Sequence, residues 1–339
     1  MRKEVILITG ANGEIGHGLI KKIGEENRAR IVALDLKPID EDLMPFCERS
    51  IQGDILDKML LGRLLAEYEI QTIYHLASIL STKSEYNPET AHEINVEGTL
   101  NLLRLGVELS QWQGCSVKFI YPSSIAVYGL PDIETKKKEG KIKEYRWCQP
   151  ITMYGCNKIY CEHLGRYYSR YYRQLAKEPI KNSIDFRCIR FPGLISADTV
   201  PTGGTSDYGP EMLHNAAQGL SYDCFVQSDT RIPFMAMPDA IKSLLLLESA
   251  PVEHLTQLSY NVSSFSPSAA EIKNCTQEAY PDALINFEVN QSRQIIVDSW
   301  PEDVDDSPAK RDWGWKPDFD LQRSFNDYLI PAMRRRYKS

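Results

Sequence analysis

Short apolar runs alternate with longer amphipathic stretches through the first half of the chain. Four such runs, at residues 5–9, 31–36, 72–76 and 118–121, have the length and apolar character of strands buried on both faces. Between them lie segments such as residues 17–23, where apolar residues recur at helical spacing. Strands and helices that alternate in this way form a parallel sheet with helices on both faces. The pattern therefore predicts a doubly wound α/β fold.

The alternation stops near residue 190, and the following part of the chain is richer in glycine and proline. Neither an internal repeat nor a low-complexity linker separates the two parts, and residues 235–262 return to the pattern of the sheet. We therefore expect two interleaved units: residues 1–190 with 235–262 form a nucleotide-binding domain, and residues 191–234 with 263–339 form a smaller, mixed α/β substrate lobe. In that lobe, Ser266 and Pro267 predict a helix with proline just inside its start.

A glycine-rich turn joins the first predicted strand to the first predicted helix. Gly10 permits a tight turn, Gly13 lets the backbone approach a pyrophosphate, and Gly16 allows the helix to pack closely on the sheet. The second strand leads to Asp35, which is placed to accept hydrogen bonds from an adenosine ribose and to repel a 2′-phosphate. The pattern favours NAD over NADP, although the neighbouring Lys37 weakens that preference slightly.

The ends of the following strands supply further candidates for the cofactor site. Asp54 and Ile55 could hold the adenine, and a simple strand-end turn capped by Asp54 is an equally good interpretation. The strand at 72–76 leads into Ala77 and Ser81, and the strand at 118–121 leads into Ser124. In an open parallel sheet, ligands bind outside the carboxyl ends of the strands, so these serines should face the reacting end of the cofactor. For Ser124, a helix or turn cap is the alternative.

Tyr154 and Lys158 are the strongest candidates for proton transfer. Residues 153–176 predict a helix, on which a spacing of four places both side chains on one face. A nearby cation lowers the pKa of a phenol by about 1 to 3 units, which would allow Tyr154 to act as a base near neutral pH. An exposed helical pair is the alternative when these two residues are considered alone.

Composition narrows the class of protein. The net charge of −7 and the lack of a basic stripe argue against nucleic-acid and membrane partners. The eight cysteines and six histidines show no metal-ligand spacing, so we expect no metal and reduced thiols. The first strand begins by residue 5, which leaves no room for a targeting peptide and predicts a cytoplasmic protein. Residues 130–149 form a charged stretch, in which the run from Lys136 to Lys138 is expected to be a solvated loop.

Taken together, the glycine turn, Asp35, Asn95, Ser124, Tyr154 and Lys158 resemble the extended short-chain dehydrogenase/reductase family, which has a Rossmann fold. Residues 190–196, 201–208, 231–240 and 305–315 resemble its short-chain L-threonine 3-dehydrogenases. The resemblance implies oxidation of the threonine β-hydroxyl by NAD to 2-amino-3-ketobutyrate. It also implies a homodimer, formed through the Tyr154 helix and the helix after Asn95, where tyrosines crowd residues 160–172.

The resemblance implies a set of site residues. The expected catalytic residues are Tyr154, Lys158, Ser124 and Asn95, of which Asn95 would support a helix bend and a water relay. The expected cofactor contacts are Gly10, Asn12, Gly13, Glu14, Ile15, Gly16, Asp35, Asp54, Ile55, Leu76, Ala77, Asn95, Tyr154, Lys158 and Pro192. The expected substrate contacts are Ser81, Ser124, Tyr154, Gly193, Thr205, Ser206 and Asp207. Asp239 is expected to be structural.

Two other functions remain open from the sequence. A nucleotide-sugar 4-epimerase or dehydratase uses the same serine, tyrosine and lysine, but its pocket needs basic residues for a diphosphate, and residues 199–207 contain none. A non-catalytic NAD-binding scaffold needs only the glycine turn, so the complete set of Ser124, Tyr154 and Lys158 argues against it.

Overall fold

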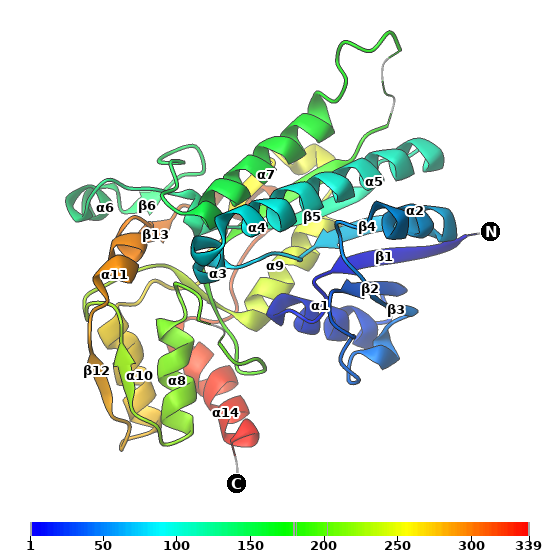
Figure 1. Cartoon of the computed structure of the whole chain (residues 1–339). Helices are drawn as coiled ribbons and strands as arrows, with labels where there is room; N and C mark the ends of the chain where they lie inside the picture. The colour runs from blue at the N-terminus through cyan, green and yellow to red at the C-terminus, as the bar shows by residue number, and fades with distance from the viewer. Residues whose placement is uncertain (1, 179, 181, 202, 338–339) are drawn as a thin grey trace.

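A seven-stranded parallel sheet forms the centre of the molecule (Figure 1). The structure is a computed structural model, and it describes residues 2–178, 180, 182–201 and 203–337. The strand order is β3-β2-β1-β4-β5-β7-β11, and all neighbouring strands are parallel. The strands of this sheet are β1 Lys3–Thr9, β2 Ile31–Asp35, β3 Arg49–Gln52, β4 Tyr68–His75, β5 Lys118–Ser124, β7 Asp185–Phe191 and β11 Ser259–Asn261. The predicted α/β Rossmann fold is confirmed.

Helices cover both faces of the sheet (Figure 1). Helices α2, α5 and α7 pack on one face in one apolar cluster, and α1 and α9 pack on the other. The helices are α1 Glu14–Glu25, α2 Lys58–Glu67, α3 Ser81–Tyr86, α4 Pro88–His92, α5 Gly98–Gln113, α6 Ile133–Glu139, α7 Met153–Arg170, α8 Tyr208–Ala217, α9 Met237–Ser249, α10 Ala269–Ala279, α11 Gln291–Asp298, α12 Ser307–Trp313, α13 Leu321–Arg323 and α14 Ile330–Arg336. Among the described residues, no helix has the length and apolar character needed to cross a membrane.

Three two-stranded parallel pairs lie outside the central sheet. They are β8 Gly193–Ile195 with β10 Phe234–Ala236, β9 Tyr222–Cys224 with β12 Ile285–Phe287, and β6 Lys141–Ile142 with β13 Asp303–Val304. A third apolar cluster joins these pairs to α8, α10, α11 and α14, which lie together beside the sheet (Figure 1). The carboxyl ends of the sheet strands meet this second group of elements, and the candidate site lies there.

The run from Lys136 to Lys138, within the charged stretch at 130–149, is not the solvated loop that we expected. The stretch contains α6 and β6, and β6 pairs with β13 near the end of the chain. Lys136 is only 4% exposed, and its Nζ donates to the carbonyl oxygen of Val297 at 3.2 Å. Burial lowers the pKa of Lys136 to about 8. A helix that packs on the protein has one buried face, and in α6 Lys136 lies on that face.

Two predicted helix boundaries were also wrong. Helix α7 ends at Arg170 rather than near residue 176, because Tyr171 leaves the helical conformation and the chain turns. Helix α10 begins after Ser268, whose side chain caps it together with Glu271, so Pro267 precedes the helix. The capping box provides two hydrogen bonds at the helix start, which places the boundary beyond the proline.

Candidate active site

The turn between β1 and α1 is shaped by its glycines. Gly10 has a φ of +67°, and a Cβ at this position would lie 2.5 Å from the backbone nitrogen of Ala77. A Cβ on Gly16 would meet the carbonyl oxygen of Ala11 at 2.4 Å. Gly13 precedes α1 and offers no side chain to cap it, so the first backbone N–H groups of the helix are free for an anion. The turn therefore has the shape that a pyrophosphate needs.

A cavity of about 260 Å³ adjoins the turn at the ends of β2, β3 and β4. Asp35 lines it, and its carboxylate accepts the backbone N–H groups of Asn12 and Lys37, each at 3.0 Å. Asp54 Oδ1 accepts the backbone N–H of Leu56 at 2.9 Å, so Asp54 caps a turn as well as lining the cavity. The expected cofactor residues that line this cavity are Gly10, Gly13, Asp35, Asp54, Ile55, Leu76 and Ala77.

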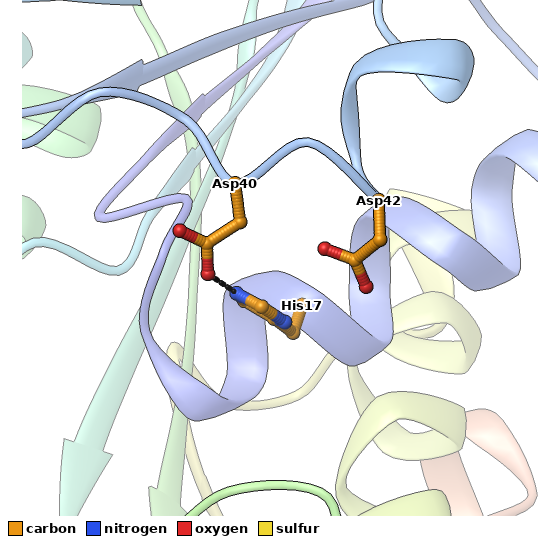
Figure 2. Close-up of side chains that lie close together, drawn as sticks. All are labelled: His17, Asp40 and Asp42. Atoms are coloured by element: carbon orange, nitrogen blue, oxygen red, sulfur yellow. Dashed lines mark ion pairs between the residues drawn. The ribbon is translucent and has the colours of Figure 1, made fainter.

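The side chain of Asn12 lines neither this cavity nor the catalytic one. Its Oδ1 accepts the backbone N–H of Asp40 at 3.1 Å. Asp40 Oδ2 lies 3.0 Å from Nε2 of His17 on α1, and Asp42 lies beside them (Figure 2). Asp42 is paired with Lys21 at 2.6 Å, so all three groups of this cluster already have partners. The cluster fastens the segment after Asp35 onto α1 rather than forming part of either cavity.

The catalytic cavity, of about 250 Å³, lies where β1, β5, α7 and residues 191–207 meet. The structure brings most of the expected site residues together here. Those that line it are Gly10, Gly13, Glu14, Ile15, Gly16, Leu76, Ser81, Ser124, Tyr154, Lys158, Pro192, Gly193, Ser206 and Asp207. Burial raises the pKa of Glu14, and a hydrogen bond from the Thr199 hydroxyl opposes that shift.

Ser124, Tyr154 and Lys158 share this cavity. Ser124 ends β5, and its hydroxyl oxygen accepts the backbone N–H of Ala126 at 3.1 Å, so the capping interpretation holds, and the hydroxyl also lines the cavity. Tyr154 and Lys158 lie one turn apart on α7. The buried Nζ of Lys158 donates to the carbonyl oxygen of Pro122 at 2.8 Å and lies 5.5 Å from the centre of the Tyr154 ring. Three side chains that can donate or accept protons, Ser124, Tyr154 and Lys158, therefore line the same cavity.

The expected lowering of the Tyr154 pKa is not observed. Burial raises the pKa of this phenol above its usual value and lowers the pKa of Lys158 to about 8. The reason lies in the direction of the lysine: its Nζ lies over the Tyr121 ring, 4.7 Å from the ring centre, and bonds to a carbonyl rather than to the phenol. Desolvation, which disfavours the charged form of each group, therefore dominates at both positions.

A buried ion pair lies next to the candidate catalytic residues. Arg190 of β7 makes two hydrogen bonds to Glu162 of α7, at 2.9 Å and 2.7 Å. Glu162 also accepts the hydroxyl of Ser123 at 2.6 Å, next to Ser124. Both charged side chains are about 5% exposed. The sequence pattern did not indicate this pair, although Glu162 lies four residues beyond Lys158 and so on the same face of α7.

Asn95 supports the segment after β4 instead of lining a cavity. It lies in a π-helical turn, η2 Glu93–Glu97, between α4 and α5. Its Oδ1 accepts the backbone N–H of Ile79 at 2.7 Å, and its Nδ2 donates to the Ile79 carbonyl at 3.0 Å. The side chain therefore fixes the segment that leads to Ser81. No contact in the described residues tests the water relay.

The residues expected to contact substrate divide into two groups. Ser81, Gly193, Ser206 and Asp207 line the catalytic cavity. Thr205 is 3% exposed and does not line it; its backbone N–H and its hydroxyl both donate to the Ser81 hydroxyl, at 3.2 Å and 3.1 Å. Thr205 therefore holds this segment in place. Thr202, in the same stretch of sequence, lies outside the described residues.

Several cavity residues were not expected. Trp300 reaches the cavity from the turn after α11, and Leu80 and Leu194 also line it. The only signal for Trp300 was an aromatic residue followed by proline in the expected substrate lobe, and such a pair is too common to identify a site. Asp239 is structural, as expected: it is fully buried and accepts the backbone N–H of Asp318 at 2.9 Å.

Comparison with known proteins places this geometry in a family. Residues 6–263 match the model of the NAD dependent epimerase/dehydratase family. The mitochondrial L-threonine 3-dehydrogenase of Bos taurus is 33% identical over 93% of this chain and 79% of its own. An uncharacterized epimerase/dehydratase of Staphylococcus saprophyticus is 33% identical over 98% of both chains. A solved structure described as a monomeric L-threonine 3-dehydrogenase from a metagenome database is 35% identical, with a TM-score of 0.84 over 98% of this chain and 100% of its own.

These matches agree with the two cavities. The glycine turn accommodates a pyrophosphate, and Asp35 stands where a ribose hydroxyl is recognised, so the residues present fit the NAD that the family uses. The resemblance to L-threonine 3-dehydrogenases is confirmed by relatives of that name in sequence and in structure. The chain belongs to the NAD dependent epimerase/dehydratase family, within the extended short-chain dehydrogenases/reductases.

Proposed function

We propose that this protein oxidises the β-hydroxyl of L-threonine with NAD, producing 2-amino-3-ketobutyrate and NADH. The observation that carries the proposal is the charge of the catalytic cavity. Among the described residues that line it, Lys158 is the one basic side chain, and Glu14 and Asp207 are the acidic ones. Such a lining suits a small ligand with an ammonium group and hydroxyl, for which Ser81, Ser124 and Ser206 supply hydrogen bonds.

The nucleotide-sugar alternative fits this cavity less well. A sugar nucleotide carries a diphosphate, which proteins bind with several arginine or lysine side chains or with helix N-termini. The cavity lining contains no arginine among the described residues, and Lys158 lies at the catalytic tyrosine. The relatives named as L-threonine 3-dehydrogenases point in the same direction.

In the proposed reaction, NAD supplies the hydride acceptor. The chain supplies the proton chemistry and the positions. Tyr154 removes the proton of the β-hydroxyl, and Ser124 donates a hydrogen bond to the same oxygen as it becomes a carbonyl. Lys158 would hold the nicotinamide ribose and offset the negative charge that forms on Tyr154. The walls formed by Trp300, Leu80 and the segment at 203–207 exclude water from the reacting group.

The direct test is NADH absorbance when the purified protein meets NAD and L-threonine. We expect absorbance at the NADH band to rise with L-threonine and to stay flat with UDP-glucose. A sugar product from UDP-glucose, with no NADH from threonine, would favour the epimerase function instead. D-threonine and L-serine serve as controls for the stereochemistry and for the methyl group.

Cofactor preference should depend on Asp35. Replacing it with serine removes a carboxylate that repels a 2′-phosphate, and like charges in contact cost several kcal/mol. We expect Asp35→Ser to narrow the ratio of kcat/KM for NAD over NADP by roughly tenfold or more. Because Asp35 also accepts the Asn12 N–H, thermal unfolding of the variant serves as the control. Equal use of both cofactors by the parent protein would contradict the role of Asp35.

Threonine affinity should depend on the segment at 203–207. Thr205→Ala removes a hydrogen bond to Ser81, and Asp207→Ala removes the acceptor of the Gly204 N–H, which lies at 2.6 Å. We expect each change to raise the apparent KM for threonine by about tenfold, as for a lost buried hydrogen bond, and to leave that for NAD nearly unchanged. Unaltered threonine kinetics in both variants would remove this segment from the site.

Activity should rise with pH through the neutral and mildly alkaline range. The base is the ionised form of Tyr154, and burial raises the pKa of that phenol. Below this pKa the ionised fraction grows tenfold per pH unit, so kcat at saturating NAD and threonine should rise toward that slope. A profile that is flat from pH 6 to 9 would show that ionisation of Tyr154 does not limit the reaction.

We further propose the arrangement of the whole protein. Residues 1–190 with 235–262 would form the NAD-binding domain, since β11 joins the central sheet, and residues 191–234 with 263–339 would form the substrate lobe. A homodimer through α5 and α7 would cover Tyr160 and Tyr167, which are 50% and 41% exposed. Sedimentation would test it, because one similar structure is described as monomeric. A cytoplasmic location would suit the eight free cysteines.

A further inference from the structure

The segment at 203–207 is a tight turn, and two hydrogen bonds join Gly204 to Asp207 within it. The backbone N–H of Gly204 donates to Asp207 Oδ2 at 2.6 Å, and the Gly204 carbonyl accepts the backbone N–H of Asp207 at 3.1 Å. Both residues line the catalytic cavity, as does Ser206 between them. The position of the Gly204 peptide therefore sets where Ser206 stands over the cavity.

Arg293 reaches this peptide from a distant part of the chain. It lies in the first turn of α11, where Asn290 caps the helix by accepting the Arg293 N–H at 3.1 Å. The Arg293 Nη2 donates to the Gly204 carbonyl at 2.7 Å. The guanidinium lies on the ring of Phe225, with its carbon 3.3 Å from the ring centre. The backbone of Arg293 is therefore held by the helix cap, and its guanidinium is held by the Phe225 ring, in the position from which it donates to the turn.

The charge of Arg293 is directed at a carbonyl rather than at a carboxylate. Among the described residues, no carboxylate oxygen lies within 4.0 Å of its guanidinium nitrogens, and its Nε is buried without a hydrogen-bond partner. A buried, unpaired N–H costs free energy, and a stacked arginine exchanged for an apolar residue would avoid that cost. The charge of Arg293 also opposes the burial that raises the pKa of Glu211. The bond to Gly204 has an ionised donor, and such bonds are about twice as strong as neutral ones.

We propose that Arg293 is a positioning residue for substrate binding: it holds the Gly204 peptide so that Ser206 and Asp207 stand in register with Ser124 and Tyr154. The role in substrate binding rests on the proposed threonine reaction. The hydrogen bond by which Arg293 holds the turn does not depend on that reaction. Arg293 does not line the catalytic cavity, so it acts through Gly204 and not by contact with substrate.

The kinetic test compares Arg293→Gln and Arg293→Lys with the parent. Glutamine keeps a neutral donor, and lysine keeps the charge but loses the planar group that stacks on Phe225. We expect the glutamine variant to raise the KM for threonine by roughly ten- to a hundredfold, the loss that a charged hydrogen bond gives. Its kcat should change by less than about threefold, and NAD affinity should not change, since Arg293 contacts the turn and makes no hydrogen bond to Ser124, Tyr154 or Lys158 among the described residues. Lysine should restore part of the threonine affinity.

Arg231→Gln is the matched control. Arg231 is also a partly buried arginine of the substrate lobe that donates to a backbone carbonyl, that of Ser266, and pairs with Glu271. It does not line the catalytic cavity. A general loosening of the lobe would affect both variants equally, whereas the proposed role predicts a threonine KM that changes only in the Arg293 variants.

A second measurement needs no substrate. Backbone hydrogen exchange in the peptide covering residues 203–213 should be faster in Arg293→Gln than in the parent and in Arg231→Gln, with the glycine turn at 10–16 unchanged. If exchange is faster in Arg293→Gln but the parent does not oxidise threonine, the proposed function is refuted and the role of Arg293 in holding the turn stands. Unchanged exchange, or an equal loss of NAD and threonine affinity, would overturn the role of Arg293.

Discussion

Replacing Tyr154 with phenylalanine should lower the turnover of threonine by about 10² to 10⁴, the usual contribution of a general base. The change removes one oxygen from the catalytic cavity and keeps the ring, which packs against the apolar cluster of the substrate lobe. Folding and NAD binding should therefore survive. Steady-state rates of NADH formation, with cofactor affinity measured by fluorescence titration, would separate loss of the base from loss of the fold.

Lys158→Met provides the comparison for that experiment. Its Nζ donates to the Pro122 carbonyl at 2.8 Å, at the end of β5. Loss of the ammonium should weaken NAD binding as well as turnover, whereas Tyr154→Phe should affect turnover alone. A Tyr154→Phe protein that folds, binds NAD and oxidises threonine at close to the parent rate would show that another group is the base.

Breaking the Arg190–Glu162 pair should cause the largest loss of stability. Both side chains are about 5% exposed, so Glu162→Gln or Arg190→Met leaves one uncompensated charge in the interior. Removal of one partner from such a pair costs about 3 to 5 kcal/mol of unfolding free energy, whereas replacing both partners with apolar residues is often close to neutral. Chemical denaturation of both single variants and of Glu162→Leu with Arg190→Met would measure the three values.

The exposed Lys3–Glu48 pair provides the control, because water screens it and Glu48→Gln should change stability little. Measuring the turnover of the double variant would also show whether the pair affects the reaction. Glu162 also accepts the Ser123 hydroxyl beside Ser124. A double variant as stable as the parent but with reduced turnover would show that the pair also positions the end of β5. Single variants as stable as the parent would mean that water reaches the remaining charge.

Local patterns were sufficient to predict the sheet and the centre of the site. The strands that carry Asp35 and Ser124 and the helix that carries Tyr154 are marked by short-range periodicity, and their chain order fixes which strand ends meet. For the same reason the glycine turn could be located. Helix ends were harder: the end of α7 at Arg170 depends on how the chain turns beyond it, which no short pattern describes.

What the sequence could not predict depends on contacts between distant residues. Trp300 and Ser81 line one cavity although more than two hundred residues separate them. The pairing of Arg190 with Glu162 follows from the placement of β7 beside α7, and neither residue stands out in its own segment. The Tyr154 pKa was misjudged because helical spacing brings a lysine close but does not say where its ammonium points.

Strand β11 has a consequence for synthesis of the chain. It is the outer strand of the sheet, it pairs with β7, and it comes from residues 259–261, after every residue assigned to acid–base chemistry. When the ribosome has made the chain through β7, the glycine turn, Ser124 and Tyr154 are all present. The edge of β7 that later pairs with β11 is still open. Open edges invite pairing with other chains. A fragment that stops before residue 259 would contain the whole proton-transfer apparatus and still be prone to aggregate, so residues 259–261 have to be made before the β7 edge is covered.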